Sequence, residues 1–196
     1  MDLRSLKRLI GEVRRLAPTQ RIIIFGSSSL LASFPDVAPE EIGVELTLDA
    51  DFFLDPDDVT MRGSLIGELG RERAYHAATG HYGDFVDLRL ADAFPKDWRQ
   101  RLVPVLGCDN VFGIDPVDMA VTKVAATARS RLSRRLGGEM PDRGLKDINT
   151  IVALLKTGRI ARDEFQRRYD TMDYAPALIV ESSNVIQEIL RMVDAA

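Results

Sequence analysis

Apolar and polar residues recur with two different spacings along this chain, and the change of spacing divides it into two parts. In the first part, stretches with helical spacing lie between short apolar or alternating runs that are typical of strands. From about Asp115 onward, the apolar residues recur only with helical spacing. We therefore predict an α+β fold, with a β-sheet and its helices in residues 1–107 and a helical subdomain in residues 108–196.

The predicted elements follow from these patterns and from the residues that begin and end them. The first is an amphipathic helix whose apolar face carries Leu3, Leu6, Ile10 and Val13. Further helices are expected to begin near Gly26, Asp55, Asp115, Leu145, Glu164 and Leu178. Strands are expected at residues 21–25, 43–52 and 85–90.

The strand predicted at residues 43–52 carries two carboxylates on one face. Its side chains alternate, so that apolar residues point to one side and Asp49 and Asp51 to the other. Carboxylates two residues apart lie about 7 Å apart at Cα and point the same way, so both can bind one divalent cation. Such oxygen ligands favour Mg²⁺ or Mn²⁺ and a phosphate-bearing ligand. The alternative is a solvated edge strand whose acidic residues oppose aggregation.

The two other strands add a phosphate pocket and a third carboxylate. The strand at residues 21–25 runs into the sequence Gly26-Ser27-Ser28-Ser29, where the N–H groups of a helix start and the serine hydroxyls suit a triphosphate. An ordinary turn is the alternative there. Asp87, on the strand predicted at residues 85–90, would complete a two-metal site and could deprotonate an attacking hydroxyl. Alternatively, Asp87 is a strand-edge charge paired with Arg89.

Composition narrows the kind of site. The 196 residues have a formal net charge of −4 and include one cysteine, Cys108, and two histidines, His76 and His81. They therefore offer neither a disulfide framework nor a Cys/His zinc site, and any metal must be held by oxygen. No run of about 18 apolar residues is present, so we expect no membrane segment and a cytoplasmic location.

Charged residues of the predicted helical part are candidates for binding the substrates. Lys123 lies within a predicted helix. It either has a functional role or is an ordinary surface lysine, with its charged group in solvent and its stem on apolar neighbours. Arg129, Arg131, Arg134 and Arg135 form either a solvated helix face or a surface for an RNA phosphate backbone. Asp147 is either an accessory to the chemistry or a favourable first-turn charge of its helix.

These motifs resemble those of the nucleotidyltransferase fold of the DNA polymerase β superfamily. The matching elements are Phe25-Gly26-Ser27 after a strand, Asp49-Ala50-Asp51 on the next strand, and Asp87 on a third. With Lys123, Arg129 and Lys146-Asp147-Ile148, the chain is most similar to AbiEii-type toxins and their uncharacterised relatives. The resemblance implies a mixed sheet flanked by helices, followed by a helical subdomain that closes one side of a cleft.

The same resemblance implies roles for individual residues. Asp49, Asp51 and Asp87 would hold Mg²⁺ or Mn²⁺ and carry the catalysis. Gly26, Ser27, Ser28, Lys123 and Asp147 would bind the nucleotide. The expected activity is transfer of a nucleoside monophosphate from an NTP to an acceptor hydroxyl, with tRNA as an acceptor and an antitoxin protein as a partner. The alternatives are an Asp-x-Asp glycosyltransferase that binds a sugar nucleotide and a degenerate nucleotidyltransferase fold that serves as a binding module.

Overall fold

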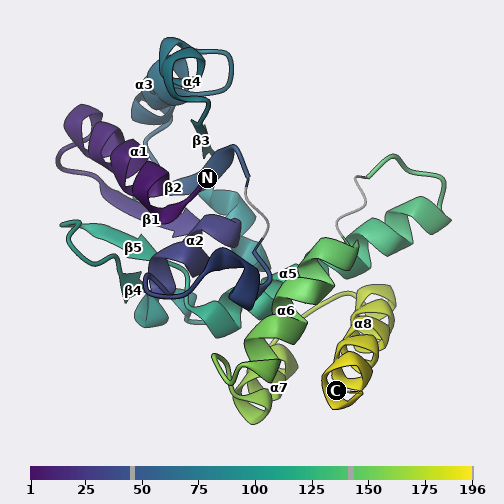
Figure 1. Ribbon diagram of the computed structural model, residues 1–196. Helices are drawn as coiled ribbons and strands as arrows, with labels where there is room; N and C mark the ends of the chain where they lie inside the picture. Colours follow the sequence, from purple (N-terminus) through teal and green to yellow (C-terminus); the bar gives the residue numbers. More distant parts are fainter. Residues whose placement is uncertain (45–46, 141–143, 196) are drawn as a thin grey trace. The chain divides into compact units, whose positions relative to one another are not determined.

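The computed structural model describes residues 1–44, 47–140 and 144–195, and it confirms the predicted α+β fold (Figure 1). The chain divides into two compact units. The sheet unit contains Met1–Pro39, Glu45–Asp92 and Arg99–Asp115. The helical unit contains Glu40–Val44, Ala93–Trp98 and Pro116–Ala196. Each unit is described by itself below.

The sheet unit is built on a mixed sheet of five strands in the order β3-β2-β1-β5-β4. The central strand β1 runs antiparallel to β2 and parallel to β5, while β2 and β3 are parallel and β4 and β5 antiparallel. The edge strand β3 therefore has a single neighbour, β2. The strands are β1 (Arg21–Phe25), β2 (Asp49–Asp55), β3 (Tyr82–Phe85), β4 (Val103–Pro104) and β5 (Val111–Gly113).

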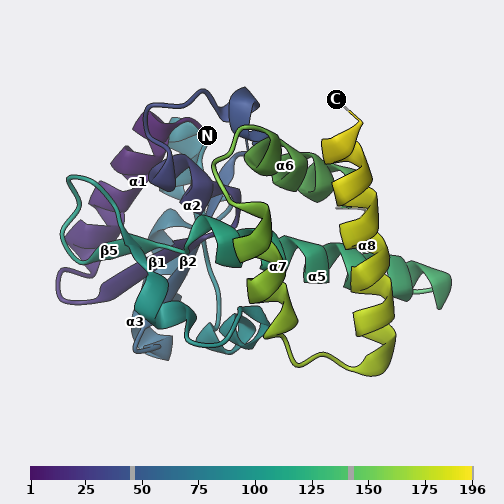
Figure 2. The same ribbon diagram turned by 90° about the horizontal axis from the view of Figure 1, so that it is seen from below.

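Four α-helices complete the sheet unit, and α2 packs on β1, β2 and β5. The first helix begins where Asp2 Oδ1 accepts a hydrogen bond from Ser5 N at 2.7 Å, and it buries Leu6, Leu9 and Val13. Figures 1 and 2 show this helix beside α2, on which it packs. The helices are α1 (Leu3–Leu16), α2 (Gly26–Ser33), α3 (Val59–Leu69) and α4 (Ala74–Thr79), with 3₁₀ turns η2 (Leu88–Ala93) and η3 (Trp98–Arg101) nearby in sequence.

The helical unit has α5 (Pro116–Arg135) as its central element, which packs on three other helices (Figure 2). Those helices are α6 (Gly144–Lys156), α7 (Arg162–Asp170) and α8 (Pro176–Asp194), and the turn η1 (Pro39–Ile42) lies where the unit's first segment begins. Val121, Val124, Phe165 and Val185 are fully buried in its core. A buried ion pair, in which Arg168 Nη1 lies 2.7 Å from Asp118 Oδ1, joins α7 to α5.

The predicted strand at residues 85–90 is wrong, and the reason is local. β3 ends at Phe85, and its last ladder bond is the one from Val86 N to Phe52 O at 3.0 Å. Asp87 Oδ1 then accepts a hydrogen bond from Arg89 N at 2.9 Å, which turns the backbone away from the sheet. Residues 88–93 form η2 instead, and the alternation of apolar residues there does not mark a strand.

Two other boundaries differ from the prediction. The second strand begins at Asp49 instead of Gly43, and Leu48, expected on the apolar face, is 60% exposed. Glu45 and Leu46, which belong to the predicted strand, lie outside the described residues. The predicted division after Gly107 falls within the sheet unit, because β5 pairs with β1 and keeps residues 108–115 there.

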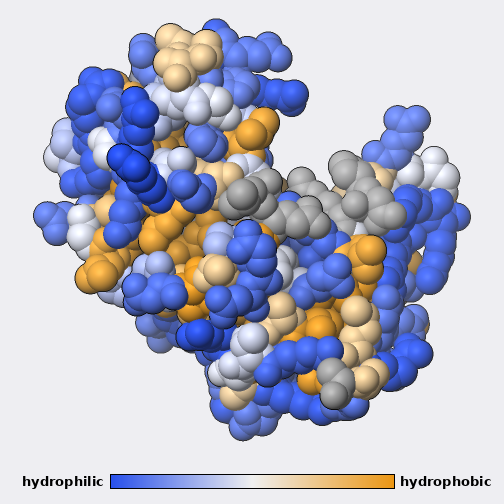
Figure 3. Space-filling view, in the orientation of Figure 1, coloured by the Kyte–Doolittle hydropathy of each residue, from blue (hydrophilic) through white to orange (hydrophobic). Residues whose placement is uncertain are grey.

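The surface is mainly polar. The face shown in Figure 3 is mostly hydrophilic, with separate apolar areas between the charged residues. Large apolar side chains that are exposed include Val59, Leu106, Leu136 and Leu145. Of the helices that the structure describes, none combines the length and the apolar character needed to cross a membrane.

Candidate functional site

In the sheet unit, acidic side chains gather where β2 and β3 begin. Register pairs join Asp49 to Tyr82 and Asp51 to Asp84 across the parallel strands. Partners in such a pair project from the same face of the sheet, and Asp49 and Asp51 share a face because they are two residues apart. Asp49, Asp51 and Asp84 therefore form one acidic face. Sequence reasoning found the first two of these carboxylates and missed the third.

The start of α2 lies against this acidic face. Phe25, the last residue of β1, pairs with Asp51, so the chain enters α2 directly beside that carboxylate. Gly26 has φ +68°, and a Cβ there would overlap Asp51 Oδ2. Only glycine combines this backbone conformation with so close an approach. The predicted Gly26 and Asp51 are thus brought together by the fold.

The serines after Gly26 differ in what they do. Ser28 is buried, and its Oγ donates to the backbone oxygen of Asp49 at 3.4 Å, which links α2 to β2. Ser29 is also buried and donates to Gly26 O at 2.8 Å. Ser27 is half-buried, and within the described residues its hydroxyl has no hydrogen-bond partner. Ser27 and the first N–H groups of α2 are therefore the groups that can bind an anion here.

The electrostatics of the acidic face favour a cation. The pKa of Asp84 is raised above its ordinary value, first because its carboxyl group is partly desolvated and then because of the negative charge of Asp49. Burial also raises the pKa of the Tyr82 hydroxyl, and the nearby charges of Asp49, Asp84 and Asp51 add to the effect. Each negative charge thus raises the free energy needed to ionise the next acidic group. A bound cation would remove that cost.

The positions of the carboxylates on this face determine whether they can bind one divalent cation. Neighbouring parallel strands lie about 4.8 Å apart, so carboxylates at paired positions can converge on one ion by changing rotamer. As the side chains stand, the described part of the chain has no three His, Cys, Asp or Glu side chains close enough together to hold a metal. The oxygen donors of Asp49, Asp51 and Asp84 suit Mg²⁺ or Mn²⁺ in chemical type, and a change of rotamer would be needed to bring them together.

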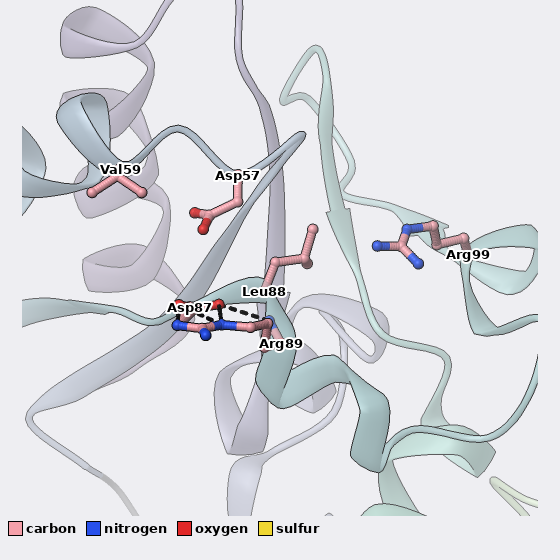
Figure 4. Close-up of a pocket in the computed structure, with 6 residues that line it drawn as sticks. All are labelled: Asp57, Val59, Asp87, Leu88, Arg89 and Arg99. Atoms are coloured by element: carbon pink, nitrogen blue, oxygen red, sulfur yellow. Dashed lines mark hydrogen bonds and ion pairs between the residues drawn. The ribbon is translucent and has the colours of Figure 1, made fainter.

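Asp87 lies two residues beyond the end of β3, and Figure 4 shows it paired with Arg89. Arg89 Nη2 lies 2.6 Å from Asp87 Oδ2, and Arg62 Nη1 lies 3.6 Å from the same oxygen. The hydrogen bonds from Arg89 hold the pKa of Asp87 well below its usual range. The prediction that Asp87 lies on a strand with its carboxylate on the polar face is therefore wrong, and the pairing with Arg89 is what the fold forms. Asp84, three residues earlier, stands in register with Asp51.

Lys123 and Asp147 form a buried ion pair in the helical unit. Lys123 Nζ donates to Asp147 Oδ1, and each side chain is only 8% exposed. The alternative of a solvated lysine is therefore wrong. Lys123 continues the buried stripe of α5 that includes Ala120, Val124 and Thr127, and this spacing in the sequence could have indicated its burial. A role of Lys123 and Asp147 in nucleotide binding stays a prediction.

The four arginines of α5 are partly engaged within the helical unit. Arg131 Nη1 lies 2.9 Å from Glu188 Oε2, and Arg135 Nη1 lies 2.6 Å from Glu181 Oε2, both on α8. Arg129 and Arg134 are exposed. Acceptor binding by these residues stays a prediction. Their partners lie far along the chain, so the sequence pattern of α5 alone could not show the pairs.

Comparisons of this chain with models of known protein families, with curated proteins and with solved structures give no match. The geometry of the sheet unit is therefore the basis for a functional conclusion. It combines an anion-binding helix start, a glycine in close approach to a carboxylate, and an acidic face suited to a divalent cation.

Replacing Asp84 with asparagine should stabilise the metal-free protein at neutral pH. A carboxyl group with a raised pKa in the folded state favours the protonated form, so its ionisation costs stability above that pKa. The gain should be less than about 1 kcal/mol, because solvent screens the charge. It should disappear as the pH falls below the ordinary value of 3.8, where the carboxyl is protonated in both states. Urea midpoints at pH 7 and at about pH 3, below the ordinary value, measure the difference.

Asp87→Asn is the matched control for this measurement, because the pKa of Asp87 is shifted in the opposite direction. Its carboxylate contributes stability that is present above the ordinary pKa and is lost on acidification. The asparagine variant should therefore be less stable than wild type at pH 7. A loss of stability in Asp84→Asn at pH 7 would contradict the electrostatic description of the acidic face.

Proposed function

We propose that this protein is a metal-dependent nucleotidyltransferase. The observation that carries the proposal is the meeting of the α2 N-terminus at Gly26 with an acidic face formed by Asp49, Asp51 and Asp84. Phosphates need hydrogen-bond donors and compensation of their charge, and this arrangement supplies both beside one another. The resemblance of the Gly-Ser and Asp-x-Asp motifs to the nucleotidyltransferase superfamily supports the same reading.

Different residues of the sheet unit would bind the phosphates and the metal. The N–H groups at the start of α2 and the Ser27 hydroxyl would bind phosphate oxygens. Asp49, Asp51 and Asp84 would hold Mg²⁺ or Mn²⁺, which when bound neutralises phosphate charge and polarises the phosphoryl group. Ser28, through its bond to the Asp49 backbone, would keep α2 and β2 in position for both groups.

The reaction follows from these roles. An acceptor hydroxyl forms a new bond to the α-phosphorus of the NTP, the bond between the α-phosphorus and the bridging oxygen breaks, and pyrophosphate leaves. The proton of the acceptor hydroxyl must move to a base. Asp84 is the candidate, because its carboxylate lies on the acidic face in register with Asp51 and can accept a proton.

The acceptor and the biological setting belong to the proposal as well. An RNA acceptor, including tRNA, would bind through the exposed arginines Arg129 and Arg134 of α5. A toxin role with an antitoxin partner rests on the resemblance to AbiEii-type proteins. A cytoplasmic location would give the enzyme its NTP supply.

The test is transfer of label from each α-labelled NTP to total RNA, protein or small hydroxylated acceptors, with Mg²⁺ or Mn²⁺. We expect label in an acceptor with one or more NTPs, complete loss of it with EDTA, and loss of it in Asp49→Asn. Consumption of a sugar nucleotide instead would establish the glycosyltransferase alternative. Binding of NTP without transfer to any acceptor would favour the binding module.

A further inference from the structure

Five cations share the side of α1 that faces away from its buried residues: Arg4, Lys7, Arg8, Arg14 and Arg15. The helix contains one acid, Glu12, which lies at the edge of this side and has its Oε2 2.8 Å from Arg15 Nε. We call the five cations the basic face of α1. The whole chain has a formal net charge of −4, so this positive charge is a local concentration within the sheet unit.

Three members of the basic face have no counter-ion in the part of the chain that the structure describes. Arg4, Lys7 and Arg8 are exposed there, and their side chains take part in no ion pair or hydrogen bond. Arg14, in contrast, donates to the backbone oxygen of Gln20 at 3.0 Å. Arg4 lies one turn from both Lys7 and Arg8, and like charges at this spacing destabilise a helix. An anionic partner would remove this repulsion.

Gly11 lies at the centre of the basic face, and the packing of the described residues gives no reason for a glycine there. It lies one turn from Lys7 and Arg8, and a Cβ at this position would meet no atom within 4 Å. Its backbone is helical, and glycine inside a helix costs stability relative to alanine. The absent side chain leaves the helix backbone open between the cations, so a bulky chain can approach it closely.

The length and composition of the basic face suit a phosphate backbone. Arg4 and Arg15 are 11 residues apart, so the face extends about 16 Å along the helix, the rise of about five nucleotides of one strand. Apolar residues of α1, among them Leu6 and Val13, are buried on its opposite side, so the face offers nothing to insert into a membrane. We propose that the basic face of α1 binds the phosphate backbone of an RNA strand, which passes closest to the helix at Gly11. Only the choice of RNA over DNA rests on the proposed function, in which RNA is the acceptor.

Fluorescence anisotropy with a labelled single-stranded RNA of about 20 nucleotides tests this inference, with neither NTP nor divalent metal present. We expect the full chain to bind with a Kd of about 1–100 µM at about 0.1 M salt, although its net charge is negative. The variant Arg4→Gln/Lys7→Gln/Arg8→Gln should bind about tenfold to a hundredfold more weakly. Its slope of log Kd against log salt should fall by about two, because three phosphate contacts are lost. Its melting temperature should stay near that of wild type, since the three side chains are exposed.

The matched control is Lys156→Gln/Arg162→Gln/Arg167→Gln, which removes three exposed cations from the helical unit and so changes the net charge equally. It should leave RNA binding within about threefold of wild type, because salt screens charges that do not contact the RNA. Gly11→Gln, which places a neutral side chain between the cations, should weaken RNA binding about threefold or more without lowering the melting temperature.

Several outcomes would overturn the inference. Equal weakening by the two triple variants would show that binding follows net charge, and unchanged binding in Gly11→Gln would exclude a close approach at that position. Absence of RNA binding at about 0.1 mM protein, or tighter binding of the same sequence as DNA or of phosphatidylserine vesicles, would do the same. Failure of nucleotidyl transfer with intact RNA binding would count against the proposed function alone, because binding is measured without NTP.

Discussion

Exchange of Asp84 for asparagine should reduce nucleotidyl transfer by about a thousandfold, because an amide cannot replace a charged metal ligand or take up the acceptor's proton. The same exchange at Asp87 should leave transfer within about threefold of wild type, because Asp87 is held by Arg89 and Arg62 away from the register of Asp51. Initial rates with a saturating NTP measure both variants. Asp49→Asn, a change in the proposed metal site, serves as the control for loss of activity.

The pair of variants separates two descriptions of the site. Near-normal transfer in Asp84→Asn together with inactivity of Asp87→Asn would identify Asp87, the residue expected from the sequence, as the third carboxylate. Cation binding gives a second readout that needs no turnover. Mn²⁺ should raise the melting temperature of wild type and of Asp87→Asn by mass action, and should raise that of Asp84→Asn much less.

The second large effect is on stability. Asp147→Asn or Lys123→Met should each destabilise the helical unit by about 3–5 kcal/mol, because each leaves a buried charge without its partner. A solvated lysine, the alternative considered from the sequence, could be replaced with little loss of stability, but Lys123 and Asp147 are both buried. Denaturant unfolding followed by Trp98 fluorescence measures the effect, since this single tryptophan belongs to the helical unit.

The double variant Lys123→Met/Asp147→Leu removes both charges together. Its stability should lie within about 2 kcal/mol of wild type, because two apolar residues can replace a buried ion pair at little cost. Lys156→Met, on the exposed end of α6, is the control for loss of a lysine and should change stability by less than about 0.5 kcal/mol. Single variants that unfold like wild type would show that the pair contributes nothing. NTP binding by the folded double variant then tests whether Lys123 also contacts the triphosphate.

The sequence predicts the fold class because its signals are local. Helical spacing fixes α1, α5 and α8, and the apolar run before Gly26 fixes β1. Strands β4 and β5 have two and three residues, too few for a periodic pattern, and they are revealed only by the pairing of β5 with β1 and of β4 with β5. The boundary between the two units was misplaced for the same reason, because it depends on which segments pair.

The site is only partly predictable for a different reason. Asp49 and Asp51 are on one strand, so alternation alone places them together. Asp84 joins them through pairing between strands, and the glycine at position 83 weakens the strand signal of Tyr82–Phe85. The next alternating run, residues 85–90, led to the prediction of Asp87 as the third carboxylate. In the structure, the backbone N–H of Arg89 donates to the Asp87 side chain, and the extended conformation ends there.

Phe85, an apolar residue of the edge strand β3, helps to fix the alignment of β3 with the acidic residues of β2. The Phe85 ring stacks on Phe52 with centroids 5.2 Å apart, on the face opposite the carboxylates. A shift of one residue along β2 would turn every side chain of β3 to the other face and would set Gly83 or Phe85 beside Asp51 in place of Asp84. β3 has four residues and, among the described strands, pairs with β2 alone, while α3 packs on it as well. The stack of Phe85 on Phe52 thus helps to keep Asp84 beside Asp51 on the acidic face, and its loss should displace Asp84 in a protein that still folds.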